Sequence, residues 1–124
     1  MVEVAQSVSP LLSGMAGAKM PIVVSHGEGR ASFHGDQFAR LQQKQAIALR
    51  YVDASGAPAV NYPDNPNGSP QGLAGVCSDD GRVTIMMPHP ERVFRPVQHS
   101  WAPPAWNEDA PWLRLFRNAR VFVN

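Results

Sequence analysis

One stretch of alternating side chains and several short apolar runs predict the strands of this chain. Residues 46–53 (AIALRYVD) place three large apolar side chains on one side of an extended backbone, which predicts a strand. Residues 73–88 (LAGVCSDDGRVTIMMP) hold two apolar runs joined by Ser-Asp-Asp-Gly, which predicts a β-hairpin. Residues 21–24 (PIVV) form a short apolar run that stops at a glycine-rich turn, and this pattern predicts a buried strand.

Two segments have the composition or spacing of helices. Residues 35–45 are rich in helix formers and offer Asp36 as a cap. Residues 111–123 carry apolar side chains at helical spacing behind a proline, and their largest side chains are expected in the core. Residues 1–18 show no strong period and predict a loop-like segment. The resulting order of elements predicts the α/β or α+β class. Two helices cannot cover both faces of a parallel sheet, so we expect part of a domain.

Composition narrows the function classes. The 124 residues carry a formal net charge of +1, so no basic face that would bind nucleic acid is expected. No apolar run approaches the roughly 20 residues that cross a bilayer, and the first ten residues lack the regions of a signal peptide. A single cysteine, Cys77, excludes an internal disulfide and a cysteine-rich metal site, and suits a reducing cytosol. Twelve prolines and ten glycines predict long, shaped loops.

The motif Met-Pro-His-Pro-Glu-Arg, residues 87–92, carries candidate chemistry. In an extended chain, His89 and Glu91 point to the same side, and the flanking prolines restrict the backbone. A carboxylate bonded to one ring nitrogen fixes the tautomer and leaves the other nitrogen as a base. The alternative is a surface turn with a solvated histidine and glutamate, because the H-x-E spacing is common.

A nucleophile to match this base is not evident. Gly-Val-Cys-Ser-Asp, residues 75–79, resembles the start of a nucleophile elbow, but Asp79 stands where the second glycine belongs and a second strand follows instead of a helix. Without a helix N-terminus the thiol lacks the dipole that would lower its pKa. Cys77 is therefore predicted to be a small core residue, with recruitment as a nucleophile kept as an alternative.

Five segments carry a resemblance to a known family. These are SHGEGR (25–30), ALRYVD (48–53), YPDNPNGSPQGLAGV (62–76), GRVTIMMPHPERVFR (81–95) and PWLRLFRNAR (111–120). Over nearly its whole length the chain resembles the C-terminal end of phosphoribosylformylglycinamidine synthase in its large, single-chain form. The resemblance implies an α/β fold: part of a class I glutamine amidotransferase-like (flavodoxin-like), three-layer domain with a β-hairpin and a C-terminal helix. Residues 1–124 would be the C-terminal portion of that domain, without its nucleophile-bearing part.

The resemblance also implies roles for individual residues. His89 and Glu91 correspond to the histidine and glutamate of a Cys-His-Glu triad, whose cysteine lies upstream of the region resembled. Ser25, His26, Gly27 and Glu28 correspond to a turn that contacts bound glutamine, although the glycines could simply permit a tight turn. The NPNGSP loop, residues 65–70, would shape the glutamine pocket or a domain contact, or only satisfy backbone groups through its asparagines. His34 and His99 show no partner pattern and are expected to be solvated.

Cofactors and partners follow from the same resemblance. The family uses glutamine-derived ammonia and ATP to convert formylglycinamide ribonucleotide to its amidine in cytoplasmic purine biosynthesis. ATP and Mg²⁺ belong to a separate synthetase domain, so this chain is expected to hold no cofactor and no metal. Its expected partners are glutamine and the remaining domains of the synthase, with no nucleic acid and no membrane. Alone, the chain is expected to be inactive and to self-associate through uncovered apolar surface. The alternative is a non-catalytic module that binds partner chains.

Overall fold

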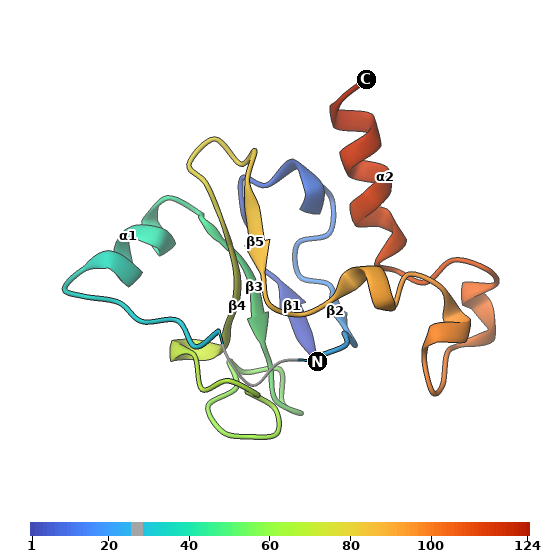
Figure 1. The fold of residues 1–124 in the computed structure, drawn as a ribbon, viewed down its shortest axis with the longest axis horizontal. Coiled ribbons are helices and arrows are strands. Elements are labelled where there is room, and N and C mark those ends of the chain that lie inside the picture. Colours follow the sequence, from blue (N-terminus) through green and yellow to red (C-terminus); the bar gives the residue numbers. More distant parts are fainter. Residues whose placement is uncertain (26–28) are drawn as a thin grey trace.

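A computed structural model describes residues 1–25 and 29–124. Its centre is a five-stranded sheet in the order β2-β1-β3-β4-β5, in which each neighbouring pair is antiparallel (Figure 1). The strands are β1 (Val2–Val4), β2 (Lys19–Met20), β3 (Ile47–Tyr51), β4 (Leu73–Cys77) and β5 (Thr84–Met86). The helices are α1 (Gln37–Gln43) and α2 (Leu113–Phe122). The predicted α/β class is confirmed.

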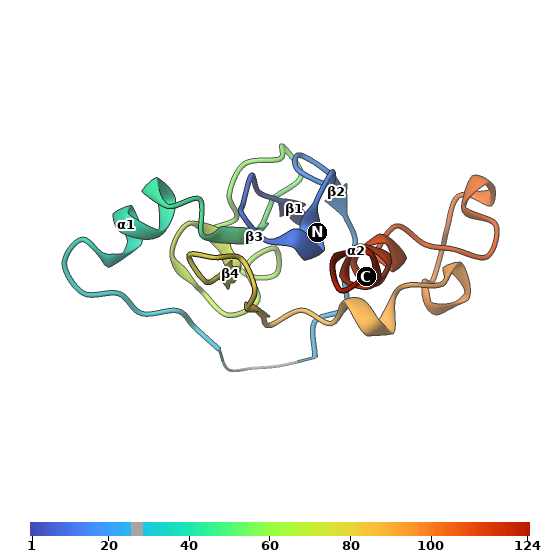
Figure 2. The same ribbon diagram turned by 90° about the horizontal axis from the view of Figure 1, so that it is seen from above.

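The two helices lie on opposite sides of the sheet, which gives three layers (Figures 1 and 2). The main core lies on the α2 side, where Trp112 and Leu115 pack with the apolar side chains of β1 and β3. In contrast, α1 buries none of its residues. Its Phe38 ring lies edge-on to Phe33, at a centroid distance of 5.3 Å. The Arg50 guanidinium lies over the same Phe38 ring. In the described part of the chain, neither helix has the length and apolar character needed to cross a bilayer.

Several predicted elements are confirmed. The strand predicted at 46–53 is β3, and the hairpin predicted at 73–88 is β4 and β5, joined by a turn at whose end Gly81 has φ +71°. The helices predicted at 35–45 and 111–123 are α1 and α2, each shorter than its apolar pattern. Strong local patterns thus located the elements, and their ends depended on tertiary packing.

The loop predicted for residues 1–18 is wrong at its start and confirmed for residues 5–18, which hold no strand or α-helix. Val2–Val4 form β1, an interior strand between β2 and β3, and a short 3-10 turn follows at Pro10–Leu12. A three-residue strand shows too few alternating positions to be recognised. Its pairing comes from residues far along the chain, since Val2 lies opposite Tyr51.

The buried strand predicted at 21–24 is also wrong. The pairing strand β2 lies just upstream and ends at Met20, because Pro21 has no N–H with which to continue the ladder. Beyond it, Val23 makes a single bridge to His89 and is only half-buried, while Val24 is exposed. This bridge is the link between the segment and the candidate site.

Two predicted side-chain roles differ from the structure. Asp36 stands at the N-terminus of α1 but makes no capping bond there, because its carboxylate pairs with Arg40 at 2.9 Å. On α2, Trp112 and Leu115 are buried as expected, while Phe116 is 39% exposed and meets Phe94 edge-on. The helix extends past the body that it packs against (Figure 1), so its later apolar positions lose their cover.

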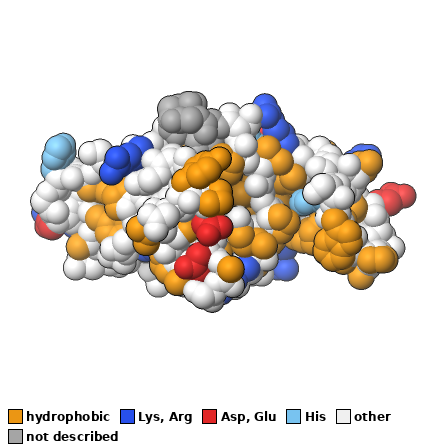
Figure 3. Space-filling view, turned by 90° about the horizontal axis from the view of Figure 1, so that it is seen from below, with side chains coloured by type: hydrophobic (Ala, Val, Ile, Leu, Met, Phe, Trp, Pro, Cys, Tyr) orange, Lys and Arg blue, Asp and Glu red, His pale blue; other side chains and the backbone are white. Residues whose placement is uncertain are grey.

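Residues 95–111 form a long loop that extends from the α2 side of the molecule (Figure 1). Two of its apolar side chains, Val97 and Trp101, are 86% and 75% exposed. Hydrophobic side chains accordingly gather at this end of the space-filling view (Figure 3). The prediction of long, proline-shaped loops is confirmed here, since 3-10 turns at Pro96–Gln98 and Pro104–Trp106 order the segment.

Candidate active site

The site is built on His89 and Glu91. The ring Nδ1 of His89 lies 2.9 Å from Oε1 of Glu91, which is hydrogen-bonding distance. A carboxylate only accepts, so Nδ1 carries the proton and donates it, and in the neutral ring Nε2 then has a free lone pair. The imidazole is partly covered, with 30% of its side chain exposed. The structure therefore joins the two residues that the sequence singled out, in the tautomer that a general base needs. Their catalytic role stays a prediction.

The backbone brings them together by a different route from the one expected. His89 is near-extended, with φ −109° and ψ 87°, but Pro90–Arg92 form one turn of 3-10 helix. The His89 N–H donates to the carbonyl of Val23 at 2.9 Å, and the His89 carbonyl accepts from the Arg92 N–H at 3.2 Å. Pro88 is fully buried and Pro90 is buried too. A tight turn pinned on both sides, rather than a simple extended chain, sets the pair.

The surroundings of Glu91 favour its charged form. Burial by itself would raise the pKa of this carboxyl. Its own backbone N–H, the hydrogen bond from His89 and the charges of His89 and Arg92 outweigh that effect, and the pKa lies below its ordinary value. The Arg92 guanidinium Nε stands 3.8 Å from the same Oε1. Glu91 thus stays ionised at neutral pH and can hold the ring. Sequence reasoning missed Arg92, although it adjoins Glu91 in the motif.

Cys77 does not supply a thiol to this base. It is buried at the end of β4, opposite Thr84 of β5. His89 lies five residues beyond Thr84 on the outgoing chain, or roughly 16 Å at the rise of an extended strand. Burial raises the pKa of the Cys77 thiol, although backbone hydrogen bonds from Val8 and Ser9 act in the opposite sense. The prediction of a small core residue is confirmed, and its burial and raised pKa count against the alternative of a recruited nucleophile.

The predicted glutamine-binding turn is described only at its start. Ser25 is exposed, and His26, Gly27 and Glu28 lie outside the described residues. The described residues on either side both approach the strand that leads to His89. Val23 bridges to His89, while Gly29 has φ +83° and lies so close to Met87 that an added Cβ would collide with that side chain. The flanks of the turn are therefore adjacent to the candidate base. Its role in binding stays a prediction.

The NPNGSP loop is held together by the hydrogen bonds of a buried asparagine. The Asn65 side chain, in a residue only 2% exposed, donates to the carbonyls of Ala59 and Ser69 at 3.0 and 2.9 Å and accepts from the Gly68 N–H at 3.0 Å. Its asparagine thus satisfies backbone groups, as one alternative proposed.

The same loop also holds the chain that follows the predicted glutamine turn. Asn67 Nδ2 donates to the Gly29 carbonyl at 3.1 Å. The Ala31 N–H donates to Ser69 Oγ at 3.0 Å. These two bonds link residues 65–70 to the flank of the candidate site, so the loop does more than close on itself.

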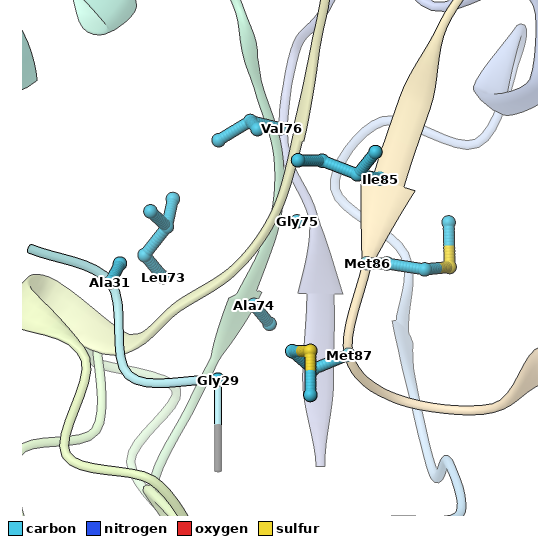
Figure 4. A pocket seen from close by; sticks show the side chains of 9 residues that line it. All are labelled: Gly29, Ala31, Leu73, Ala74, Gly75, Val76, Ile85, Met86 and Met87. Atoms are coloured by element: carbon cyan, nitrogen blue, oxygen red, sulfur yellow. The ribbon is translucent and has the colours of Figure 1, made fainter.

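An apolar cavity of about 250 Å³ lies beside this flank. Its walls come from residues 29 and 31, from β4, and from β5 with Met87 (Figure 4). Ile85 points into the space beside Val76, and Met87 points toward Gly29 and Ala74, whereas Met86 turns to the other side. These apolar side chains offer no group that would act on an amide. The candidate catalytic groups are therefore His89 and Glu91, outside this cavity.

The other two described histidines differ from each other. His34 is exposed, as expected. His99 is not simply solvated, because its Nε2 lies 3.1 Å from the Val93 carbonyl and its ring meets Trp106 at a centroid distance of 5.2 Å. The expectation for His99 is wrong, since partners six and seven residues away leave no recognisable sequence spacing.

A known family covers the part of the chain that carries this carboxylate-oriented imidazole. The sequence model of one protein family, the CobB/CobQ-like glutamine amidotransferase domain, matches residues 1–123. The chain belongs to that family. Membership covers almost the whole chain, so His89 and Glu91 both lie within the matched region.

A solved structure has the same fold. The chain is similar to one from Thermotoga maritima, titled "Structure of PurLQS", with a TM-score of 0.67 and 23% sequence identity. The likeness covers 99% of this chain and 45% of that chain. The chain therefore spans less than half of the length of the protein that it matches in fold.

Proposed function

We propose that this chain supplies the general base of a glutaminase site. The observation that carries the proposal is the 2.9 Å contact between His89 Nδ1 and Glu91 Oε1 in a member of the glutamine amidotransferase family. With Nδ1 committed to the carboxylate, Nε2 is the nitrogen that accepts a proton from a nucleophile. Glu91 fixes the ring and stabilises the imidazolium that forms. Turn 25–28, of which Ser25 is described, contacts the bound glutamine in this proposal.

The proposed reaction is a two-step acyl transfer. His89 takes the proton of a cysteine thiol, and the thiolate attacks the glutamine side-chain carbonyl to form a tetrahedral adduct. The imidazolium then gives that proton to the departing nitrogen, so ammonia leaves and a thioester remains. Water adds to the thioester with His89 again as the base, and glutamate and the free thiol are restored. The thiol comes from polypeptide beyond the described residues, because Cys77 is buried at the far end of β4.

The particular enzyme we propose is phosphoribosylformylglycinamidine synthase. The resemblance of MMPHPERVFR and NPNGSP to that family supports it, and so does the fold likeness to the PurLQS structure. Residues 1–124 would be the C-terminal portion of its glutaminase domain. The ammonia would pass to a synthetase domain that uses ATP and Mg²⁺ to make formylglycinamidine ribonucleotide in cytoplasmic purine biosynthesis. The rest of that synthase would be the chain's main partner.

The test compares two nitrogen sources in the complete synthase. His89→Ala should lower glutamine-dependent product formation by about 10²- to 10⁴-fold, the usual contribution of a general base, and leave ammonia-dependent formation unchanged. The isolated chain should release no glutamate from glutamine. Equal loss with both nitrogen sources would mean that the variant damages the fold, and full glutamine-dependent activity in His89→Ala would overturn the proposal.

A further inference from the structure

The backbone of His89 is bonded to the segment 21–23, and one side chain ties that segment to the start of α2. The Trp112 side chain, at the start of that helix, is completely buried. Its indole Nε1–H donates to the carbonyl of Pro21 at 2.7 Å, across 91 positions of sequence. A buried indole N–H needs such a partner, and the Pro21 carbonyl loses this bond if the indole is removed.

The Pro21 carbonyl that bonds Trp112 belongs to the same segment that bonds the backbone of His89. Two residues after Pro21, the carbonyl of Val23 accepts the backbone N–H of His89 at 2.9 Å. Only the backbone torsions of Ile22 and Val23 separate the two carbonyls. A shift of Pro21 therefore reaches the backbone of His89 through a short connection.

The other flank of the His-Glu turn is attached to the same end of α2. The Ala110 N–H donates to the Phe94 carbonyl at 2.9 Å, and Val93, between that bond and the turn, is 3% exposed in the same apolar cluster as Trp112. Residues 110–112 thus bind both the chain that follows the turn, at Phe94, and the neighbouring segment that bonds His89, at Pro21. The pair itself is exposed on one side, with 53% of the Glu91 side chain accessible, so its own contact is not enough to hold it rigidly.

We propose that Trp112 is a positioning residue for His89: its indole N–H holds the Pro21–Val23 segment, and that segment sets the backbone of the imidazole-bearing residue. Trp112 touches no reacting atom in this arrangement. Its effect is to keep the ring within reach of Glu91, which selects the Nδ1–H tautomer. The catalytic effect of Trp112 rests on the proposed glutaminase function. Its effect on the backbone and tautomer of His89 is independent of that function.

The structural part is tested on the chain by nuclear magnetic resonance. Replacing Trp112 with benzothienylalanine exchanges the indole N–H for sulfur at nearly constant shape, and Trp112→Phe removes the same donor with a genetically encoded residue. In either variant the ratio of Nδ1–H to Nε2–H tautomer at His89, read from ring ¹⁵N shifts, should fall by about fivefold, the factor for one lost hydrogen bond. Exchange protection of the His89 amide should fall by a similar factor. Leu115→Ala is the control, because it opens a cavity one turn along α2 and leaves the Pro21 bond in place.

The outcomes separate the two proposals. Unchanged tautomer ratio and amide protection in the folded benzothienylalanine protein would overturn the positioning role, and so would an equal change in Leu115→Ala. In the complete synthase, Trp112→Phe should lower kcat for glutamine hydrolysis with little effect on KM, and should spare ammonia-dependent synthesis. A changed tautomer without a changed kcat would support the positioning role and count against His89 as the base.

Discussion

The His89 ring and the Glu91 carboxylate meet at 2.9 Å across a single buried proline, Pro90. The contact leaves the second ring nitrogen available and directs the charge of Glu91 to the first. A proline between the partners limits the backbone torsions over which they can separate. Exposed ion pairs stabilise folds only weakly. The main effect of this exposed pair is therefore to orient the imidazole.

Glu91→Gln should lower glutamine-dependent activity of the complete synthase by about tenfold to a hundredfold, less than for a fully buried orienting carboxylate. The amide keeps the shape but no longer favours the Nδ1–H tautomer or the imidazolium. Steady-state rates with glutamine and with ammonia provide the measurement. A glutamine-dependent rate equal to wild type would show that Glu91 does not orient the ring.

The contribution of Glu91 to stability should depend on pH in the acid range. Its folded pKa lies below the ordinary value of 4.5, so the stabilisation is fully present above that pH and is lost as the pH falls through the folded pKa. The urea-unfolding free energies of wild type and Glu91→Gln should therefore differ near neutral pH and converge in acid. A difference that grows on acidification would contradict the sign of the shift.

Cys77→Ala should leave glutamine-dependent activity of the complete synthase unchanged. The side chain is buried at the opposite end of β4 and β5 from His89, and burial raises its thiol pKa. Loss of the buried sulfur should cost about 1 kcal/mol of unfolding free energy. Alkylation by iodoacetamide should be slow in the folded chain and fast in urea. Loss of glutaminase activity without loss of stability would restore Cys77 as a candidate nucleophile.

Asn65→Ala should destabilise the chain by about 2–3 kcal/mol, because the carbonyls of Ala59 and Ser69 and the Gly68 N–H lose a buried partner. Asn67→Ala is the matched control. It removes two less buried bonds, one to the Gly29 carbonyl and one from the Ser69 N–H, and should cost about 1 kcal/mol. Urea-unfolding midpoints of the two variants give the comparison. Equal costs would mean that residues 65–70 are not held mainly by the buried asparagine.

The isolated chain should self-associate through the edge of its sheet. β5 is an edge strand, and Ile85 on it is 62% exposed, next to Val83 at 59%. Edge strands with exposed apolar side chains pair with other chains, and a charge on the edge opposes that pairing. Light scattering should show a mass that rises with concentration, and Ile85→Lys should reduce the rise. Val97→Lys, on the 95–111 loop, is the control. A monomer at all concentrations would contradict the expectation.

Local sequence patterns determined much of this fold. Alternation of large apolar side chains over 46–53 and two apolar runs over 73–88 located β3, β4 and β5, because a buried strand needs apolar side chains where it packs. Helical spacing located α2, and the H-P-E spacing brought His89 and Glu91 together, because residues so close in sequence cannot separate far. Patterns of this kind are short-range, so they can be recognised without knowledge of the rest of the chain.

Tertiary structure alone decided the remainder. β1 is an interior strand because Val2 lies opposite Tyr51, and His99 is bonded because Val93 and Trp106 fold back on it. The hydrogen bond from Trp112 to Pro21 spans 91 positions, and no periodic pattern in the sequence predicts it. Such contacts depend on which distant segments share a core, and one chain's sequence encodes that choice only through the packing of all of its parts together.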